Sequence, residues 1–385
     1  MTIGSNGELE HTHYWTGPDD LNLSRLIKVA VVKGRVMFVE KDSSNVWYGG
    51  FESVRGVLTK FPLGFIHPQG GNVVDIATLT LDGGVGQDDL TCFFMSNGDM
   101  LLYQGIDIAI GGSWSKIGTF SIGKLLGDNK PIHYANDTVA ITQDGIVPIQ
   151  DMIARARNQN QDTKISNKIA STIAAIGERY GENRKGWQSH FFPKANWLLF
   201  NIPSDAGTGY HQYIMNSQTK AWARFIDIPA FCWHEYNDKI LFGGPNGIIY
   251  EMNSGYSDDG DFINGNIETA FTYLRTAEDK NFNFAKTLLE TNGNLELGLG
   301  VSTNFKRRAE IPTSGSVASS SLGWGELTWA DWMWGDSEVT ENKWQEVHGE
   351  GSSVSLRCSV KGKGIQLSIY SFDLLYHIRQ RLTPL

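Results

Sequence analysis

The sequence has few cysteines, and this argues against both a zinc site and a disulfide-stabilised secreted domain. Of its 385 residues only three are cysteine, Cys92, Cys232 and Cys358, and they lie far apart. An odd and widely spaced set has neither the close pairs of a zinc site nor the density of a disulfide-stabilised secreted domain. We therefore expect buried free thiols in a reducing compartment.

Long apolar runs are also missing. A membrane-spanning helix needs about 20 consecutive apolar residues, and no run in the sequence approaches this length. The N-terminus has no basic stretch followed by an apolar core, which is the pattern of a secretory signal peptide. We expect a soluble chain, made in a cytoplasm, without a membrane span.

Charged residues are scarce, and acidic residues outnumber basic ones. Asp, Glu, Lys and Arg make up 19% of the chain, and the net charge is −9. An acidic chain repels DNA, which argues against a free-standing nucleic-acid binder. Glycine is frequent, at 43 residues, and aromatic residues reach 11%. This composition is typical of an all-β protein with many turns.

Catalytic motifs are absent as well. The nine histidines are scattered without an H-E-x-x-H pattern, and there is no G-x-S-x-G elbow or Walker A loop. Acidic residues gather in two groups along the chain. The second group, at 258–261, lacks the residue spacing and the final Glu of a calcium-binding loop. Solvated turn carboxylates are the favoured interpretation, since nothing indicates the paired carboxylates of a glycosidase. These residues are Asp82, Asp88 and Asp89 on one loop, and Asp258, Asp259 and Asp261 on another. We predict no enzyme activity, no cofactor and no metal.

The stretch 231–252, FCWHEYNDKILFGGPNGIIYEM, carries most of the fold prediction. It has three short apolar runs separated by Asn237-Asp238 and by the Gly-rich loop 243–247. Asn, Asp and Gly supply the positive φ angles that tight hairpin turns need, so we predict three antiparallel strands. Similar hairpins centre near 34, 98, 145 and 206, which suits the blades of a β-propeller.

One segment breaks the β pattern. In 149–186 the residues Ile165, Ile169, Ile173 and Ile176 recur at helical spacing, with Ser166 as a start signal and Gly181 as a stop. We predict two helices inserted between blades, which either contact a neighbouring molecule or cover one end of the propeller.

Beyond a polar, Gly-rich linker, period-two strands predict an antiparallel β-sandwich. Between its strands lies a loop dense in tryptophan, for which core, subunit interface and ligand platform all stay open. Its residues are Trp324, Trp329, Trp332, Trp334 and Trp344. The predicted divisions are an N-terminal arm (1–26), propeller blades (27–148), a helical insertion (149–186), further blades (187–253), a linker (254–266) and the sandwich (267–385).

Over about 28 to 275 the chain resembles the tail nozzle proteins, also called tail stabilisation or tail tubular proteins, of short-tailed bacteriophages. The resemblance rests on a chain of short matches. They include 35–38, Trp47-Tyr48, Asp82-Gly83-Gly84, Asp88-Asp89, Ser96-Asn97-Gly98, 103–105, Trp114, 142–145, 186–188, Phe192-Pro193, 200–203, 212–216, 220–225, Phe231-Cys232, Asn237-Asp238, 241–243, Gly247 and Tyr250.

The resemblance implies a structural protein of the virion tail. Such subunits assemble into a ring, usually sixfold, below the portal and adaptor rings, and the ring continues the channel through which genome DNA is ejected without specific binding. Tailspikes or fibres are the further partners. The helical insertion and the Trp-rich loop suit interfaces between copies. Either acidic group suits the wall of a DNA channel. Lys or Arg side chains in its place would bind the DNA phosphates and hold the DNA back.

Two other functions stay open. The first is a receptor-binding or adhesion module that stacks its tryptophans on surface glycans. The second, less favoured, is a propeller glycosidase or depolymerase.

Overall fold

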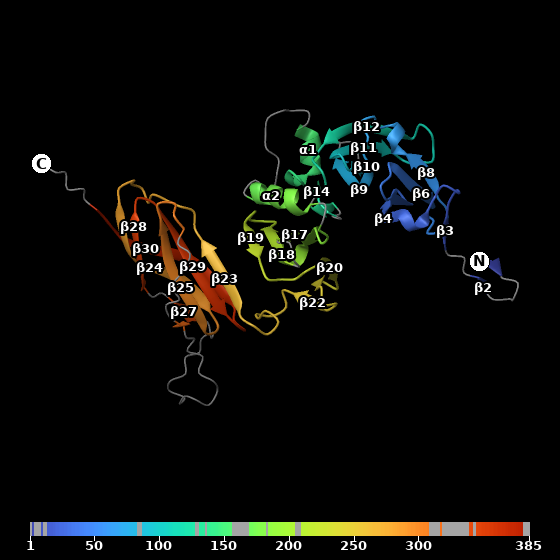
Figure 1. The fold of residues 1–385 in the computed structure, drawn as a ribbon. Helices are drawn as coiled ribbons and strands as arrows, with labels where there is room; N and C mark the ends of the chain where they lie inside the picture. The colour runs from blue at the N-terminus through green and yellow to red at the C-terminus, as the bar shows by residue number, and fades with distance from the viewer. Residues whose placement is uncertain are drawn as a thin grey trace. The chain divides into compact units, whose positions relative to one another are not determined.

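A computed structural model of the chain shows two compact units, Met1–Met252 (unit 1) and Asn253–Leu385 (unit 2) (Figure 1). It describes residues 2–3, 9–10, 14–82, 87–127, 131–134, 137–155, 169–181, 184–204, 209–307, 316–317, 339–341 and 344–379. None of the described helices is long and apolar enough to cross a membrane.

Unit 1 is a β-propeller-like succession of antiparallel sheets of three or four strands, each formed by strands that lie close together in the chain. Among the described residues there are five such sheets, numbered here in chain order. The first holds β4 (Leu26–Val32), β5 (Arg35–Glu40), β6 (Asn45–Phe51) and β8 (Thr59–Pro62), and the second β9 (Val73–Asp82), β10 (Gln87–Met95), β11 (Asp99–Gly105) and β12 (Trp114–Ser121). The third holds β13 (Ile132–Tyr134), β14 (Asp137–Thr142) and β15 (Gly145–Pro148), and the fourth β16 (Gln188–Phe192), β17 (Trp197–Pro203), β18 (Tyr210–Asn216) and β19 (Trp222–Phe225). The fifth holds β20 (Cys232–Tyr236), β21 (Lys239–Gly243) and β22 (Ile249–Met252), which confirms the three strands predicted for 231–252.

Local turn chemistry explains where these strands end. Lys33 and Gly34 join β4 to β5 with φ of 47° and 73°, and Asn237 and Asp238 join β20 to β21 with φ of 50° and 57°. Two successive positive φ angles define the hairpin turn whose twist matches that of its strands. The hairpin expected near 206 has its turn at 205–208, outside the described residues.

Apolar layers between neighbouring sheets hold the propeller-like unit together. Phe93 and Met95 of the second sheet pack with Met37 and Val39 of the first. Similar layers join the third sheet to the fourth and the fourth to the fifth. Each internal sheet therefore buries both of its faces, as blades do.

The helical insertion packs onto these layers. Helix α1 (Ile149–Arg155) buries Ile149 and Ile153 against the second sheet. Helix α2 (Ala170–Tyr180) buries Ile173 in the layer between the third and fourth sheets, and it ends at Gly181 as predicted. Its N-cap is Ile169, without a side-chain cap, and Ser166 lies outside the described residues. The apolar faces of both helices are thus used inside unit 1.

The short elements of unit 1 lie mostly on the first sheet and its connections. Strand β3 (Trp15–Thr16) pairs in parallel with β7 (Gly56–Val57), and β1 (Thr2–Ile3) pairs with β2 (Leu9–Glu10). Three 3-10 turns complete the set: η1 (Leu23–Arg25), η2 (Leu63–Phe65) and η3 (Pro193–Ala195).

Unit 2 is the expected antiparallel β-sandwich. One sheet runs β23 (Ile263–Glu268), β29 (Val354–Gly362), β25 (Leu295–Thr303) and β26 (Ser316–Val317). In the other, β24 (Lys280–Thr291) pairs with β27 (Val339–Glu341), β28 (Trp344–Gly351) and β30 (Leu367–Ile378). Phe282, Leu289, Leu297 and Leu356 meet in the buried layer between the two sheets.

Two expectations for this region need correction, and one strand was missed. Strand β23 begins at Ile263, inside the expected linker 254–266, because it is an exposed edge strand held by backbone pairing with β29 and has no apolar alternation to reveal it. Trp344 is the first residue of strand β28 and not part of a loop. The central strand β24 was not predicted at all, since Asn, Lys, Thr and Glu interrupt its apolar pattern.

Candidate binding site between the first two sheets

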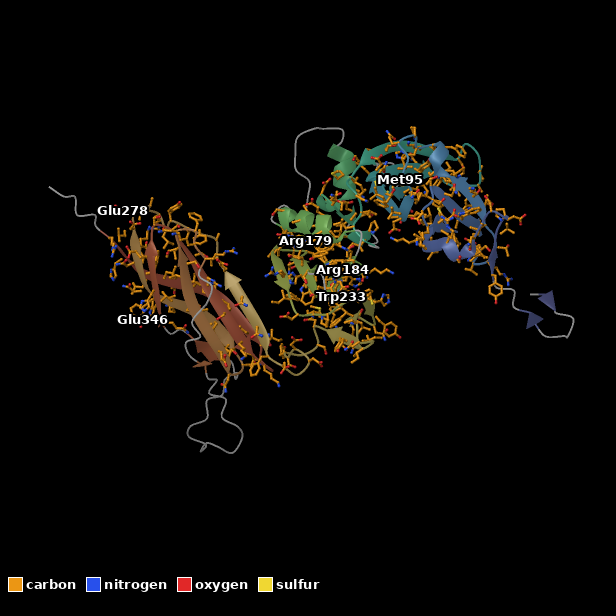
Figure 2. All side chains as sticks on the ribbon, in the orientation of Figure 1. Met95, Arg179, Arg184, Trp233, Glu278 and Glu346 are labelled. Carbon is orange, nitrogen blue, oxygen red and sulfur yellow. The ribbon has the colours of Figure 1, made fainter. Side chains whose placement is uncertain are left out.

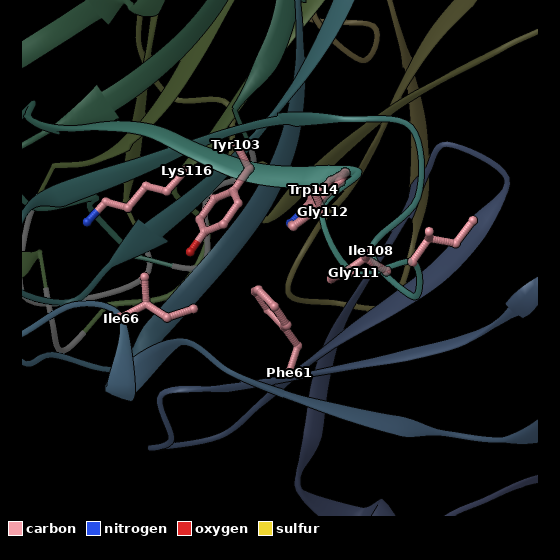
Figure 3. Close-up of a pocket in the computed structure, with 9 residues that line it drawn as sticks. Phe61, Ile66, Tyr103, Ile108, Gly111, Gly112, Trp114 and Lys116 are labelled. Atoms are coloured by element: carbon pink, nitrogen blue, oxygen red, sulfur yellow. The ribbon is translucent and has the colours of Figure 1, made fainter.

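An aromatic pocket of about 290 Å³ lies between the first and second sheets (Figure 3). Its volume is close to the lower limit of about 300 Å³ for small-molecule sites. The first sheet and the turn after it contribute one wall, and β11, β12 and the loop between them contribute the rest. The lining residues are Phe61, Ile66, Tyr103, Ile108, Ile110, Gly111, Gly112, Trp114 and Lys116.

Strand geometry places the aromatic side chains together. Tyr103 of β11 lies opposite Lys116 of β12, just after a register shift in that pair of strands. Trp114 stacks on Tyr103 with ring centroids 5.9 Å apart, and Phe61 meets Tyr103 edge-on at 5.9 Å. Trp114 and Lys116 are two residues apart on one strand, so both point to the pocket face. Figure 3 shows the Tyr103 hydroxyl directed toward the space beside Ile66.

An ion pair fixes the loop 106–113 that closes the pocket. The Arg35 guanidinium donates from Nε and Nη2 to the two carboxylate oxygens of Asp107, each at 2.8 Å. Asp107 Oδ1 also accepts from the Ala109 backbone N–H at 2.8 Å. The hydrogen bond from Arg35 is the main cause that lowers the pKa of Asp107 below its usual range. The paired fork ties the loop to β5 of the first sheet.

Two polar atoms inside the pocket walls are unpartnered. Among the described residues, the Tyr103 hydroxyl and the Trp114 Nε1–H are buried and form no hydrogen bond. Burial raises the pKa of Tyr103 to about 12, so the hydroxyl keeps its proton at neutral pH. A buried polar group without a hydrogen-bond partner destabilises the folded state by about 1–3 kcal/mol. Most buried polar groups in proteins therefore have a partner.

Lysine and glycine complete the chemistry of the pocket. Lys116 is half-buried and forms no ion pair within the described part of the chain. Gly111 and Gly112 have open space where a side chain would begin. The side chains that line the pocket offer N–H and O–H donors and one cation, and none of them is a carboxylate or an amide.

Exposed apolar residues surround the mouth. Ile66 and Ile110 line the pocket and are 38% and 58% exposed, and Phe65, next to Ile66 in the chain, is 92% exposed. Large apolar groups gathered at a concave site are typical of protein interaction surfaces.

The two predicted acidic groups belong to different units. In unit 1, Asp82 ends β9, while Asp88 and Asp89 lie in β10 and not on a loop, because β10 extends back to Gln87. In unit 2, Asp258 and Asp261 form a backbone bridge around Asp259, and all three are exposed. Within the described chain, no group of three or more His, Cys, Asp or Glu side chains is placed to hold a metal ion.

The predicted tryptophan interface is described at one residue only. Trp324, Trp329, Trp332 and Trp334 lie outside the described residues. Trp344 is about half exposed, and the Lys286 ammonium lies 4.9 Å from the centre of its ring. A cation over the ring face accounts for this contact within unit 2.

The expectation of three buried thiols is correct for two of them. Cys92 and Cys358 are buried, and burial raises the pKa of Cys358 to about 11. Cys232 is exposed, because β20 turns Trp233 and not Cys232 toward the fourth sheet. Figure 2 shows Trp233 on this last sheet, with Met95 on the second.

The pocket itself was not predicted. Phe61 and Trp114 are far apart in the chain, and only the packing of one sheet on the next brings them together. The pair Gly111-Gly112 beside Trp114 is the sequence signal that could have pointed to it.

Comparisons with known proteins find likeness in shape alone. No protein-family model matches the chain, and no curated protein matches it significantly. Solved structures do match, among them a putative 6-phosphogluconolactonase from Bacteroides uniformis, with TM-score 0.32, 11% identity, and 58% of this chain and 68% of that chain covered. The WD40 domain of SCAP from fission yeast matches with TM-score 0.30 and 10% identity, over 89% of this chain and 85% of that one. A glycoside hydrolase family 43 arabinoxylan arabinofuranohydrolase from Bacillus subtilis matches with TM-score 0.26 and 9% identity, over 92% and 95%. Similarity this low transfers no activity to this chain.

Proposed function

We propose that the chain is a non-enzymatic structural subunit of a short-tailed phage tail, and that it assembles with itself into a ring-shaped nozzle. The ring extends the DNA channel below the portal and adaptor, and it contacts tailspikes or fibres. The resemblance over about 28 to 275 suggests this role, and one observation in the fold supports the self-assembly on which it depends.

That observation is an apolar stripe on β4. Ile27, Val29 and Val31 alternate along the strand and are 51%, 48% and 68% exposed. The opposite face carries Ala30 and Val32, which pack toward the second sheet. β-branched residues exposed along the edge strand of a sheet are suited to pack against a further layer.

A ring requires a heterologous contact, in which one surface of a copy meets a different surface of the next. The first sheet lies at the beginning of unit 1 in the chain, and the fifth sheet lies at its end. Surfaces at opposite ends of a chain of blades are suited to such a head-to-tail contact. The net charge of −9 suits a wall along which DNA slides.

The pocket supports a glycan-binding or glycosidase role less well. Sugar hydroxyls are recognised by donors and acceptors together, and glycoside hydrolysis needs two carboxyl groups. The lining side chains of the pocket include no carboxylate and no amide. Its chemistry is that of an apolar docking site with one cation.

Sedimentation velocity and negative-stain images of the purified chain test the proposal. We expect closed rings, and we expect the double variant Ile27→Asp/Val31→Asp to remain monomeric with an unchanged melting temperature. Val54→Asp is the matched control, because Val54 is 83% exposed and lies outside the stripe. A wild-type chain that stays monomeric at high concentration, alone and with adaptor rings, contradicts the proposal.

A further inference from the structure

We propose that the pocket between the first and second sheets binds a small monocarboxylic acid with an apolar body, and that Lys116 pairs with its carboxylate. This inference goes beyond the proposed function and does not depend on ring assembly, because every residue that lines the pocket belongs to unit 1.

The walls of the pocket offer apolar surface to a ligand. Phe61 comes from the first sheet, and Trp114 and Ile108 come from β12 of the second sheet and the loop before it. All three side chains are half-buried, so part of each remains accessible. Aromatic rings favour offset or edge-on contacts with a further ring. The walls therefore suit a ligand whose body is apolar and flat.

The cavity has room for one ring and a short chain. An apolar cavity of about 150 Å³ admits benzene, and this pocket has about 290 Å³. Ile66 and Ile110 line the pocket and are 38% and 58% exposed, so the cavity opens to solvent. A molecule of the size of 3-phenylpropanoate matches this space.

Lys116 supplies the charge. It lies opposite Tyr103 on β12 and is the only charged side chain among the described residues that line the pocket (Figure 3). It is half-buried, and it forms neither an ion pair nor a side-chain hydrogen bond within the described part of the chain. A partly desolvated ammonium without a counter-ion attracts an anion that can reach it.

The other charges at the pocket are already paired. The Arg35 guanidinium donates to both oxygens of Asp107, and Asp107 also accepts from the Ala109 N–H. Asp107 thus serves Arg35 and the loop backbone. Lys116 is left as the cation that can bind a ligand.

A single lysine between apolar walls selects the class of ligand. A phosphate group carries nearly two charges and is usually held by several donors, such as a helix N-terminus or an Arg cluster. A cationic ligand would need an acidic partner, and no lining side chain is a carboxylate or an amide. A monocarboxylate with an apolar body is the class that uses both Lys116 and the walls.

Isothermal titration calorimetry of the full chain with three probes tests the inference. 3-Phenylpropanoate has both ring and carboxylate, 3-phenylpropanamide keeps the ring without the charge, and propanoate keeps the charge without the ring. We expect saturable binding of 3-phenylpropanoate, at least tenfold weaker binding of the amide, and no measurable binding of propanoate. Equal affinities for the acid and the amide overturn the inference, and so does a failure of 3-phenylpropanoate to bind.

Lys116→Met separates loss of the charge from loss of the fold, because methionine keeps an unbranched apolar chain. It should weaken binding of 3-phenylpropanoate at least tenfold and leave binding of the amide unchanged, whereas a misfolded pocket would lose both. Lys194→Met, the same change at an exposed residue of η3, should leave both affinities unchanged. Binding of the acid that survives Lys116→Met overturns the pairing.

A steric variant tests where the ring lies. Gly111 lines the pocket, and a side-chain carbon built on it would meet nothing within 4 Å. Gly111→Leu should therefore fold normally, fill part of the cavity, and weaken binding of both ring-bearing probes at least threefold. Unchanged binding of both probes places them outside the pocket and overturns the inference.

Discussion

The side-chain amide of Gln188 forms a pair of hydrogen bonds with the backbone of Trp233. Gln188 Nε2 donates to the Trp233 carbonyl, and the Trp233 N–H donates to Gln188 Oε1, both at 2.7 Å. The side-chain amide thus forms the two hydrogen bonds that the backbone of a neighbouring strand would form, and it joins β16 of the fourth sheet to β20 of the fifth.

Gln188→Leu is expected to destabilise unit 1 by about 2–3 kcal/mol, because it leaves a backbone N–H and a carbonyl without partners. Urea denaturation followed by tryptophan fluorescence measures the change. Gln218→Leu is the control, since Gln218 is exposed, and it should stay within about 0.5 kcal/mol of the wild type. Equal effects of the two substitutions contradict the assigned role.

A buried ion pair joins the first two sheets. Lys28 Nζ lies 2.7 Å from Asp75 Oδ2, and both side chains are less than a tenth exposed. Lys28→Met leaves the carboxylate buried without its cation, which costs about 3–5 kcal/mol. The double variant Lys28→Met/Asp75→Leu should recover part of this loss, because neither charge remains.

The pair Lys60–Asp20 provides the control for that experiment. Its atoms lie 3.0 Å apart, but both side chains are exposed. Lys60→Met should cost less than about 1 kcal/mol in the same denaturation assay. A double variant at 28 and 75 that is no more stable than Lys28→Met alone shows that the ion pair is not the source of the loss.

Local chemistry made much of unit 1 predictable. Lys33-Gly34 and Asn237-Asp238 adopt the positive φ angles that hairpin turns require. These two turns therefore predicted the pairs of strands on either side of them. Helix α2 was found because Ile169, Ile173 and Ile176 recur on one face and Gly181 ends it.

Features that depend on distant residues were missed. The pocket requires Phe61 and Trp114, which meet only when two sheets pack. Strand β24 gains its place from three neighbouring strands, although its own sequence alternates poorly. Cys232 was expected to be buried because cysteine usually is, but the direction of a strand residue is set by register.

Acid is expected to weaken unit 1 through His190. Burial is the main cause that lowers the pKa of His190, while Glu235, whose carboxylate lies 3.9 Å from Nε2, opposes this and His234 adds to it. A lowered pKa means that the unfolded chain binds a proton at a pH where the folded chain does not. The stability that neutral His190 provides is therefore present above about pH 6.5, the unfolded value, and is lost as the pH falls below it.

Urea denaturation at pH 7.5 and pH 5.5 measures this effect. The wild type should lose more stability between the two than His190→Gln, whose side chain does not titrate. His348→Gln is the control at an exposed histidine of unit 2, and it should keep the wild-type difference. If His190→Gln retains the full difference, other groups carry the pH dependence.

Trp15 anchors the N-terminal strand on a glycine of the first sheet. Its ring meets Phe38 edge-on, with centroids 5.5 Å apart. A side-chain carbon at Gly49 would lie 2.5 Å from Trp15 Cζ3, so Gly49→Ala displaces the ring. We expect unit 1 to lose about 1–3 kcal/mol of stability, the usual cost of overpacking, and to be cleaved faster by proteases near Trp15.

Gly50→Ala is the control, because its nearest neighbour would be 3.4 Å away. Adding Trp15→Ala to Gly49→Ala should cost less than Trp15→Ala costs the wild type, since the contact is already broken. Fully additive losses contradict a direct contact between residues 15 and 49.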